Sequence, residues 1–208
     1  MKLYEFAPTR SIRARWALQE LDIPFESVPV RLTEGDGRSA EYLAINPAGK
    51  VPALVDGDFV LTESVAIVVY LAEKYPQKGL LPSDLKLRSQ LNRWMLFVVT
   101  ELEQPLWRIA RNSFLYPEAQ RQPTDIELAK GEFRTMAAVL EKHMRSREFL
   151  VGDRVSVGDF VTAYTLDWGN EVGLLGECPT LLAYMERMYH RPKAPMRIKD
   201  ALASVRAA

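Results

Sequence analysis

The stretch from Gly49 to Ile67, GKVPALVDGDFVLTESVAI, places an acid and a hydroxyl side by side where a helix is expected to begin. A serine hydroxyl at Ser64 and the free N–H groups of a first helical turn can bind a carboxylate, which the helix dipole also favours. The carboxylate of Glu63 suits an ammonium group. The pair therefore fits a small zwitterionic ligand. It also fits a plain helix cap, with Thr62 or Ser64 as the cap residue.

A β-hairpin is predicted just before this pair. The runs PALV and FVL flank Asp56-Gly57-Asp58, where glycine accepts the positive φ that a tight turn needs. Pro52 stands at the start of the first run and has no backbone N–H to donate. The hairpin can therefore present an open strand edge to a ligand.

Composition excludes several other kinds of chemistry. Cys178 is the single cysteine, so the chain has no intramolecular disulfide and no Cys-x-x-Cys redox pair. His143 and His190 lie far apart in the sequence and share no ligand spacing, so we expect no metal site. The 27 basic and 27 acidic residues cancel, which gives no long-range field toward nucleic acid or an anionic membrane.

No segment predicts a membrane or secretory protein. The N-terminal MKLYEFAPTR lacks the apolar region of a signal peptide. The longest apolar run, Val65 to Ala72, is too short to cross a bilayer. With its one cysteine, the chain is expected in the reducing cytoplasm.

Strands and helices alternate in the first third of the chain, which we predict to be one domain of residues 1–77. KLYEF and ESVPV are strand candidates, and a helical pattern opens at Ser11 between them. SAEYLAI is a short helix, the hairpin follows, and Val65 to Tyr75 forms the last helix. This order, β-α-β followed by β-β-α, predicts a four-stranded mixed sheet with helices packed on it.

A proline- and glycine-containing linker at residues 78–86 leads to a second domain, residues 87–208, in which strand signals vanish. Its first helix should be kinked by Pro105 rather than ended there. The other expected helices run from Thr124 to about Ser146 and begin at Ser156, Pro179 and Pro192.

Three stretches together resemble the cytosolic glutathione S-transferases of the bacterial, serine/threonine hydroxyl type. They are TRSIRARWALQEL, NPAGKVPALVDGDFVLTESVAIVVYL and FLVGDRVSVGDFVTAY, and their order and spacing cover essentially the whole chain. The resemblance implies a thioredoxin-like N-terminal domain, an all-helical C-terminal domain and a homodimer. In FLVGDRVSVGDFVTAY it implies a structural role, the capping of a buried helix.

The resemblance also implies that a hydroxyl at the start of the first helix hydrogen-bonds the glutathione sulfur. Ser11 matches that place, Thr9 is a rival two residues earlier, and the sequence does not separate them. Lowering a thiol pKa from near 8.5 by about two units requires roughly 2.7 kcal/mol of preferential thiolate binding. Ser11 is equally suited to helix capping. Phe6 occupies the place of the tyrosine that other members use, so that route is closed.

The remaining glutathione contacts follow from the same resemblance. It implies a cis peptide between Val51 and Pro52, which turns the Val51 backbone toward the cysteinyl part of the ligand. Lys50 is assigned to the glycyl carboxylate, although a solvated lysine is equally compatible with its position. Glu63 and Ser64 match the family's acidic-serine pair, which binds the γ-glutamyl group.

The segment EQPLWRIARNSFLY corresponds to a wall of the family's electrophile pocket. We assign Ala7, Trp107, Arg108 and Arg111 to that pocket, while noting that an aromatic stripe on a helix is commonly core. Cys178 is expected to be inert.

The resemblance thus implies a glutathione transferase that uses glutathione as co-substrate, without a metal, and attacks hydrophobic electrophiles. Two alternatives remain. One is a non-catalytic binding or regulatory module, since the family includes such members. The other is a glutathione-dependent peroxidase or disulfide reductase, which would rely on bound glutathione alone because no cysteine lies near the first helix.

Overall fold

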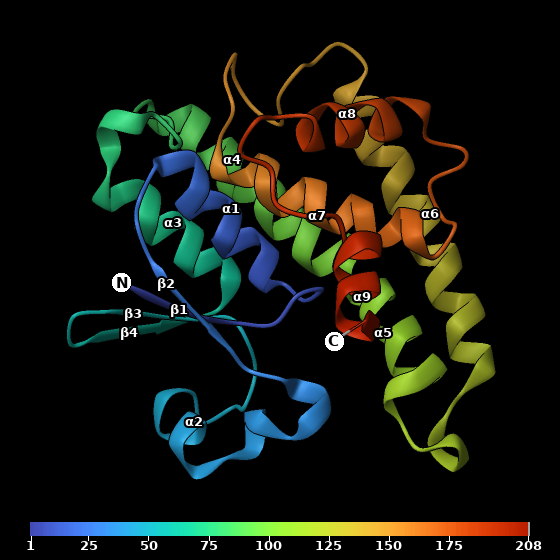
Figure 1. The fold of residues 1–208 in the computed structure, drawn as a ribbon. Coiled ribbons are helices and arrows are strands. Elements are labelled where there is room, and N and C mark those ends of the chain that lie inside the picture. Colours follow the sequence, from blue (N-terminus) through green and yellow to red (C-terminus); the bar gives the residue numbers. More distant parts are fainter. Residues whose placement is uncertain (208) are drawn as a thin grey trace. The chain divides into compact units, whose positions relative to one another are not determined.

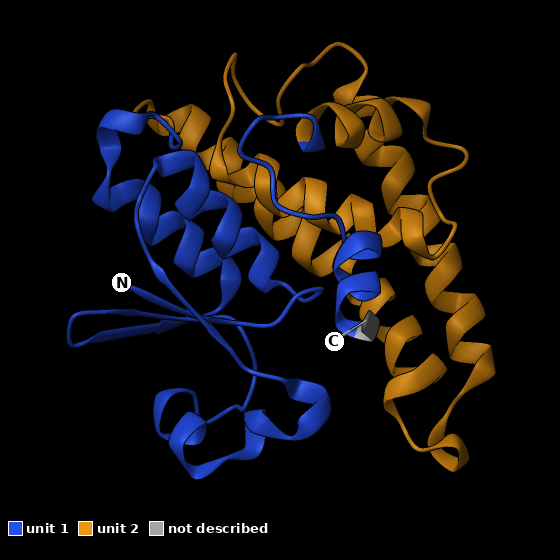
Figure 2. Ribbon diagram, in the orientation of Figure 1, with its two compact units in different colours: residues 1–81, 189–208 blue, residues 82–188 orange. Residues whose placement is uncertain are grey.

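The computed structural model describes residues 1–207 and contains two compact units. Unit 1 comprises Met1–Leu81 together with Tyr189–Ala208, and unit 2 comprises Pro82–Met188 (Figure 2). The units differ from the predicted domains in one main respect, because the C-terminal segment groups with the first unit.

Unit 1 is built on a four-stranded mixed sheet, as predicted. Its strands, in the order β2-β1-β3-β4, are β1 (Lys2–Glu5), β2 (Glu26–Pro29), β3 (Ala53–Asp56) and β4 (Phe59–Thr62). β1 and β2 run parallel, and the two other pairs are antiparallel. Gly57 has φ 66° in the predicted hairpin turn, where a positive φ favours glycine.

The register brings three chain segments to one end of this sheet. Ala53 pairs with Tyr4 on one side and with Thr62 on the other. The C-terminal end of β1, the N-terminal end of β3 and the C-terminal end of β4 therefore meet. The residues just beyond these ends are the ones to which the sequence assigned ligand contacts.

The helices of unit 1 pack on this sheet and on one another. α1 (Ser11–Leu21) and α3 (Ser64–Lys74) lie side by side, and α2 (Ala40–Ile45) lies between β2 and β3 in the chain (Figure 1). The fully buried side chains of this core include Leu3, Trp16, Leu54, Ile67 and Leu71. Both α1 and α3 begin at the sheet end described above, because each follows a strand that ends there.

The C-terminal segment is attached to α1 by a ring contact and an ion pair. Trp16 and Tyr189 have ring centroids 4.9 Å apart. Arg191 donates to both carboxylate oxygens of Glu20, at 2.7 and 2.9 Å. The predicted helix start at Pro192 is wrong, because the helix here, α9 (Ile198–Ala207), begins six residues later.

Unit 2 consists of helices. They are α4 (Leu85–Phe97), α5 (Glu103–Ala110), α6 (Pro123–Met144), α7 (Val157–Glu171) and α8 (Pro179–Tyr189). The π-helical turns Val98–Leu102 and Arg111–Leu115 join α4 to α5 and extend α5. The predicted passage of the helix through Pro105 is confirmed, because α5 runs from Glu103 to Ala110 and follows the π turn without a break.

The Ser156–Asp159 motif has the structural role that the resemblance implied. Asp159 is fully buried and accepts hydrogen bonds from the Leu150 N–H at 2.7 Å, the Ser156 N–H and hydroxyl, both at 2.8 Å, and the Tyr184 hydroxyl at 2.7 Å. These bonds fix the start of α7 inside unit 2.

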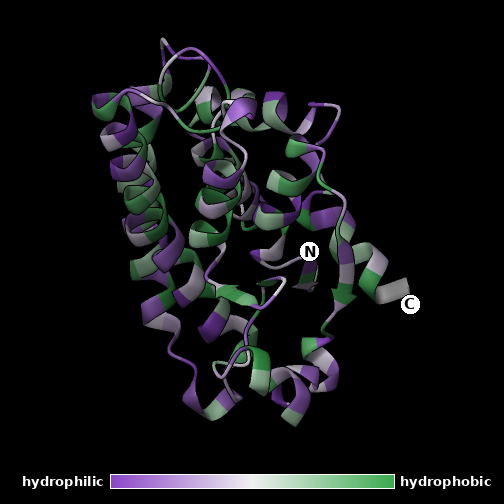
Figure 3. Ribbon diagram, turned by 90° about the vertical axis from the view of Figure 1, so that its left-hand side faces the viewer, coloured by the Kyte–Doolittle hydropathy of each residue, from purple (hydrophilic) through white to green (hydrophobic). Residues whose placement is uncertain are grey.

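Hydrophilic and hydrophobic positions alternate along the helices, as expected of amphipathic helices with one face on a core (Figure 3). Within residues 1–207, no helix combines the length and apolar character that crossing a bilayer requires.

Candidate functional site

Two hydroxyl groups meet at the N-terminal end of α1. The Ser11 hydroxyl oxygen accepts a hydrogen bond from the Phe6 backbone N–H at 3.2 Å and lies 2.9 Å from the Thr9 hydroxyl oxygen. The Thr9 hydroxyl donates to the Phe6 carbonyl at 2.5 Å and accepts from the Ser11 N–H at 3.3 Å. The loop between β1 and α1 is thus held by its own hydroxyls.

The two hydroxyls differ in how accessible they are. Ser11 is 1% exposed, whereas Thr9 is half-buried. The Phe6 carbonyl also accepts from the Thr9 N–H at 2.9 Å, so it keeps a partner if the Thr9 hydroxyl turns toward a ligand. The Ser11 O–H can then donate to Thr9 and strengthen it as a donor.

The Val51–Pro52 peptide is cis, as the resemblance implied, and so is Ala7–Pro8. Val51 lies two residues ahead of Ala53, the first residue of β3 in the sheet register. Its backbone therefore extends beyond the paired part of the strand. This position suits pairing with an added extended peptide.

Backbone and side-chain contacts fix the segment that leads to Val51. The Lys50 carbonyl accepts from the Tyr42 hydroxyl at 2.5 Å and from the Asn46 amide at 2.6 Å. Burial raises the pKa of Tyr42 to about 12, so it remains a phenol donor at neutral pH. The Lys50 side chain itself is exposed, which leaves its ammonium group accessible to a carboxylate.

A close approach of two glycines underlies this arrangement. Gly49 has φ 66°, and a Cβ built on it would lie 2.5 Å from the carbonyl oxygen of Gly37. Any side chain at position 49 would push the two loops apart. Glycine at both places therefore sets the path of the chain into Lys50.

Glu63 and Ser64 stand at the start of α3. Glu63 is exposed and has φ 67° and ψ 113°, a conformation that a residue with a side chain rarely adopts. Ser64 is 4% exposed, and its hydroxyl oxygen accepts a hydrogen bond from Arg13 Nη1 at 3.2 Å. Backbone strain of this kind is commonly found at ligand sites.

The sheet register brings these groups to one end of unit 1, beside two helix N-termini. α1 and α3 both present the positive ends of their dipoles there, which favours a bound anion. The predicted site residues that meet at this end are Ala7, Thr9, Ser11, Val51, Pro52, Glu63 and Ser64.

Arg13 was not predicted from the sequence. It is 1% exposed inside α1, among the apolar residues that cover the sheet. The sequence did contain a signal that could have identified it. Helical periodicity places this arginine on the core side of the helix, and a buried arginine requires partners.

The residues assigned to an electrophile pocket on unit 2 have different surroundings. Arg108 forms ion pairs with Asp125 and Glu132, which link α5 to α6 and raise the pKa of Arg108. Trp107 and Trp168 have ring centroids 6.4 Å apart. Arg111, in the second π turn, lies over the ring of Tyr116 at 5.7 Å. The Arg108 guanidinium is thus bound by two carboxylates of α6, inside unit 2.

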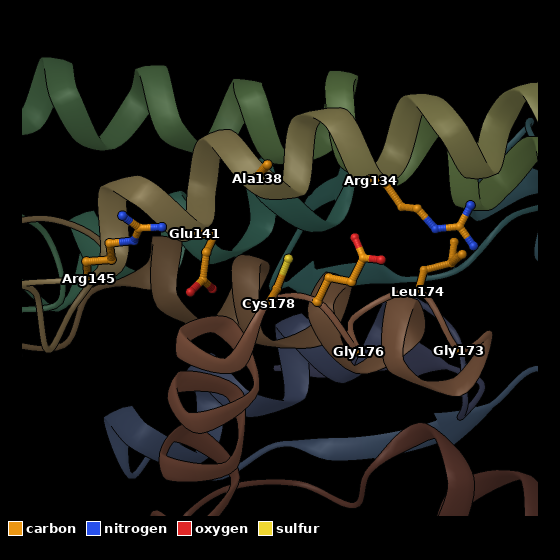
Figure 4. A pocket seen from close by; sticks show the side chains of 9 residues that line it. Arg134, Ala138, Glu141, Arg145, Gly173, Leu174, Gly176 and Cys178 are labelled. Carbon is orange, nitrogen blue, oxygen red and sulfur yellow. The ribbon is translucent and has the colours of Figure 1, made fainter.

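Unit 2 contains a cavity of about 390 Å³ between α6 and the loop before α8 (Figure 4). Glu141, on its wall, accepts from the Thr180 and Leu181 N–H groups at 3.2 and 3.0 Å and thereby caps α8. Burial first, and then the charges of Glu141 and Glu177, raise the pKa of the Cys178 thiol. A thiol that is kept protonated is a weaker nucleophile, which fits the expectation that Cys178 is inert.

No group of three or more His, Cys, Asp or Glu side chains within residues 1–207 is arranged to hold a metal ion.

Comparisons with known proteins match both parts of the chain. Residues 1–73 match the family model of the glutathione S-transferase N-terminal domain, and residues 102–192 match that of the C-terminal domain. Glutathione S-transferase F10 of Arabidopsis thaliana is 39% identical over 166 residues, which cover 76% of this chain and 77% of the relative.

Solved structures have the same fold. The ternary complex of BphK, a bacterial GST, has a TM-score of 0.83 and 29% sequence identity, and it covers 98% of both chains. A Sulfitobacter glutathione transferase homologue with bound glutathione has a TM-score of 0.80 at 24% identity, and it covers 99% of this chain and 96% of that one.

Proposed function

Because this chain belongs to the glutathione S-transferase family, we propose that it is a catalytically active transferase that joins the sulfur of glutathione to hydrophobic electrophiles. The observation that carries the proposal is the meeting of a hydroxyl pair, a cis-proline strand end and a helix N-terminus at one end of the sheet. These groups complement the thiol, the peptide backbone and the γ-glutamyl carboxylate of glutathione.

In this proposal the tripeptide lies along the end of β3. Its γ-glutamyl carboxylate binds Ser64 and the N-terminus of α3, and its α-amino group faces Glu63. Its cysteinyl backbone pairs with Val51, and its glycyl carboxylate lies near Lys50. The strained backbone of Glu63 and the accessible Lys50 side chain support these assignments.

We assign the hydrogen bond to sulfur to Thr9, with Ser11 as the group that supports it. The greater exposure of Thr9 favours this order, and so does the second donor that the Phe6 carbonyl retains. The proton leaves the thiol for solvent, the Thr9 hydroxyl and the α1 dipole stabilise the thiolate, and the thiolate attacks the electrophilic carbon as its leaving group departs. The rate gain comes from proximity and from stabilisation of a preformed anion.

Ala7, Trp107 and Arg111 are the residues we propose for the electrophile. Ala7 precedes the hydroxyl pair, and Trp107 and Arg111 lie one helical turn apart on the same stretch of helix. Arg108 is left out of this proposal, since Asp125 and Glu132 bind its guanidinium.

Steady-state conjugation of glutathione to an aryl halide tests the enzyme proposal, with retention on immobilised glutathione measured in parallel. The proposal predicts both retention and turnover. Retention without turnover would instead identify a binding module. Activity toward hydroperoxides or disulfides alone would favour the reductase alternative.

We also propose that the protein is a homodimer, as is typical of the family. Exposed apolar side chains on the edge strand β4 and on α4 support this. Phe59 and Val60 are 44% and 42% exposed, and Leu85 and Leu96 are 77% and 62% exposed. Light scattering should give twice the mass of the chain, and a monomer at micromolar concentration would contradict the proposal. The cytoplasmic location stays a prediction.

A further inference from the structure

Arg111 has no hydrogen-bond acceptor or ion-pair partner for its guanidinium group among residues 1–207. Its Nε is shielded from solvent and unpaired. The guanidinium carbon lies over the ring of Tyr116, 5.7 Å from the ring centroid. Arg108, three residues earlier, is by contrast bound by two carboxylates. Because a shielded donor without an acceptor costs free energy, the state of Arg111 calls for an explanation.

The acids of the neighbouring helix α6 are bound by other groups. The hydrogen bonds of Arg108, and more weakly the charge of Arg111, lower the pKa of Asp125. Arg111 and Asp125 are therefore close enough to interact, yet the Asp125 oxygens accept from Arg108 Nε at 3.1 Å and from the Asn112 amide at 2.9 Å. Glu132 pairs with Arg108 as well. Arg111 thus keeps its donors for a group from outside the chain.

The accessible edge of this guanidinium determines which group can bind. Nε is shielded, whereas the two terminal nitrogens are not. They form a planar fork of N–H donors that matches a carboxylate in two parallel hydrogen bonds. Tyr116 holds the guanidinium on one face, which reduces the freedom lost on binding. Arg111 also begins the π-helical turn Arg111–Leu115, and such turns are frequent at functional sites.

Trp107 supplies an apolar surface beside this fork. It lies four residues before Arg111, so the two side chains leave the same side of the helix about one turn apart. Trp107 is half-buried, and its ring packs edge-on against Trp168 with centroids 6.4 Å apart. An indole ring held in this way stacks well with the ring of an aromatic ligand. The pair therefore suits a molecule with an aromatic body and an anionic substituent.

We propose that Arg111 selects aromatic electrophiles that carry a carboxylate, which its terminal nitrogens bind while the ring packs on Trp107. This inference rests on the proposed function, in which both residues contact the electrophile. The bond-making step is unchanged. The thiolate sulfur bonds to the electrophilic carbon, the leaving group departs with the electron pair of its bond, and the carboxylate stays on the product. Neutral electrophiles remain substrates but bind less tightly.

Two electrophiles of nearly the same shape and different charge test the proposal. They are chloronitrobenzoate, with its chlorine ortho to the nitro group, and the matching chloronitrobenzamide, each assayed at saturating glutathione. Every rate is divided by that of the uncatalysed reaction, because the two substituents activate the ring differently. We expect the normalised kcat/KM of the wild type to be at least about tenfold higher for the benzoate, mainly through a lower KM.

Replacing Arg111 should remove this preference. Arg111→Met should lower kcat/KM for the benzoate about tenfold more than for the benzamide. Arg111→Lys keeps the charge but loses the fork, so it should recover part of the preference. Arg134→Met is the matched control, because it removes an exposed arginine from α6 in the same unit. Its preference for the benzoate should stay within about twofold of the wild type.

Ionic strength tests the same contact in the wild type, whether or not the Arg111 variants fold. Salt screens a charge pair, so raising the ionic strength to about 0.5 M should reduce the benzoate preference several-fold. A wild-type preference within about twofold, or one that neither salt nor Arg111→Met reduces, would overturn the role of Arg111. A wild type that conjugates neither compound would instead overturn the proposed function, and this inference with it.

Discussion

Replacing Thr9 by alanine tests which hydroxyl holds the glutathione sulfur. A hydrogen bond to a charged group is worth about 1.5–3 kcal/mol, and one pKa unit corresponds to 1.36 kcal/mol. Thr9→Ala should therefore raise the pKa of the bound thiol by about 1–2 units. The variant also loses the bonds of the hydroxyl to Phe6 and Ser11, which lowers the free energy of unfolding by about 1 kcal/mol and leaves the protein folded.

The pKa of bound glutathione is read from the ultraviolet absorbance of the thiolate and from the pH dependence of kcat/KM. Ser11→Ala should shift it by less than about one unit, because Thr9 keeps its own hydrogen and loses only a supporting donor. Thr9→Ser retains a hydroxyl and serves as the control. A large shift in Ser11→Ala with none in Thr9→Ala would refute the assignment and return the sulfur contact to Ser11.

Three further predictions concern strain, pH and the buried cap. Glu63→Gly should raise the free energy of unfolding by about 1 kcal/mol, because glycine relieves the strain of the positive φ. The same change should weaken glutathione binding. A lower melting temperature of the variant would argue against backbone strain at Glu63. Burial lowers the pKa of His143, whose ring lies 4.0 Å from that of Trp94 and whose Nε2 is 2.8 Å from the Leu150 carbonyl oxygen. Because the unfolded chain binds that proton more readily, stability is full above the ordinary histidine pKa and should fall as pH drops below about 6.5. His143→Gln should lose this decline in melting curves between pH 8 and 5, approximately the range in which histidine titrates, and an unchanged decline would assign it to other groups. Asp159→Asn should lower the free energy of unfolding, measured in urea, by about 3 kcal/mol, because the new amide group would face donors that now bind a carboxylate. A decrease below about 0.5 kcal/mol would contradict the role of Asp159 as a cap.

Local sequence signals were sufficient for most elements of the fold. The Asp56-Gly57-Asp58 turn and the runs beside it predicted the hairpin, because turn geometry and strand alternation are set by neighbouring residues. The Ser156–Asp159 spacing likewise predicted the start of α7. The helix predicted at Pro192 failed because Pro195 follows closely, and the residue before a proline resists the helical region.

Contacts between distant residues were beyond what the sequence alone could predict. The attachment of the C-terminal segment depends on Glu20 and Arg191, which are 171 positions apart. The contact of Arg13 with Ser64 depends on how α1 packs against α3. Thr9 and Ser11 were equivalent as hydroxyls, and only their different burial separates them.

Calorimetric titration with reduced glutathione tests most directly whether the end of the sheet in unit 1 is a glutathione site. The account predicts heat of binding with one ligand per chain, reduced about tenfold in affinity by Ser64→Ala. The absence of any heat at millimolar glutathione with the folded wild type would contradict it.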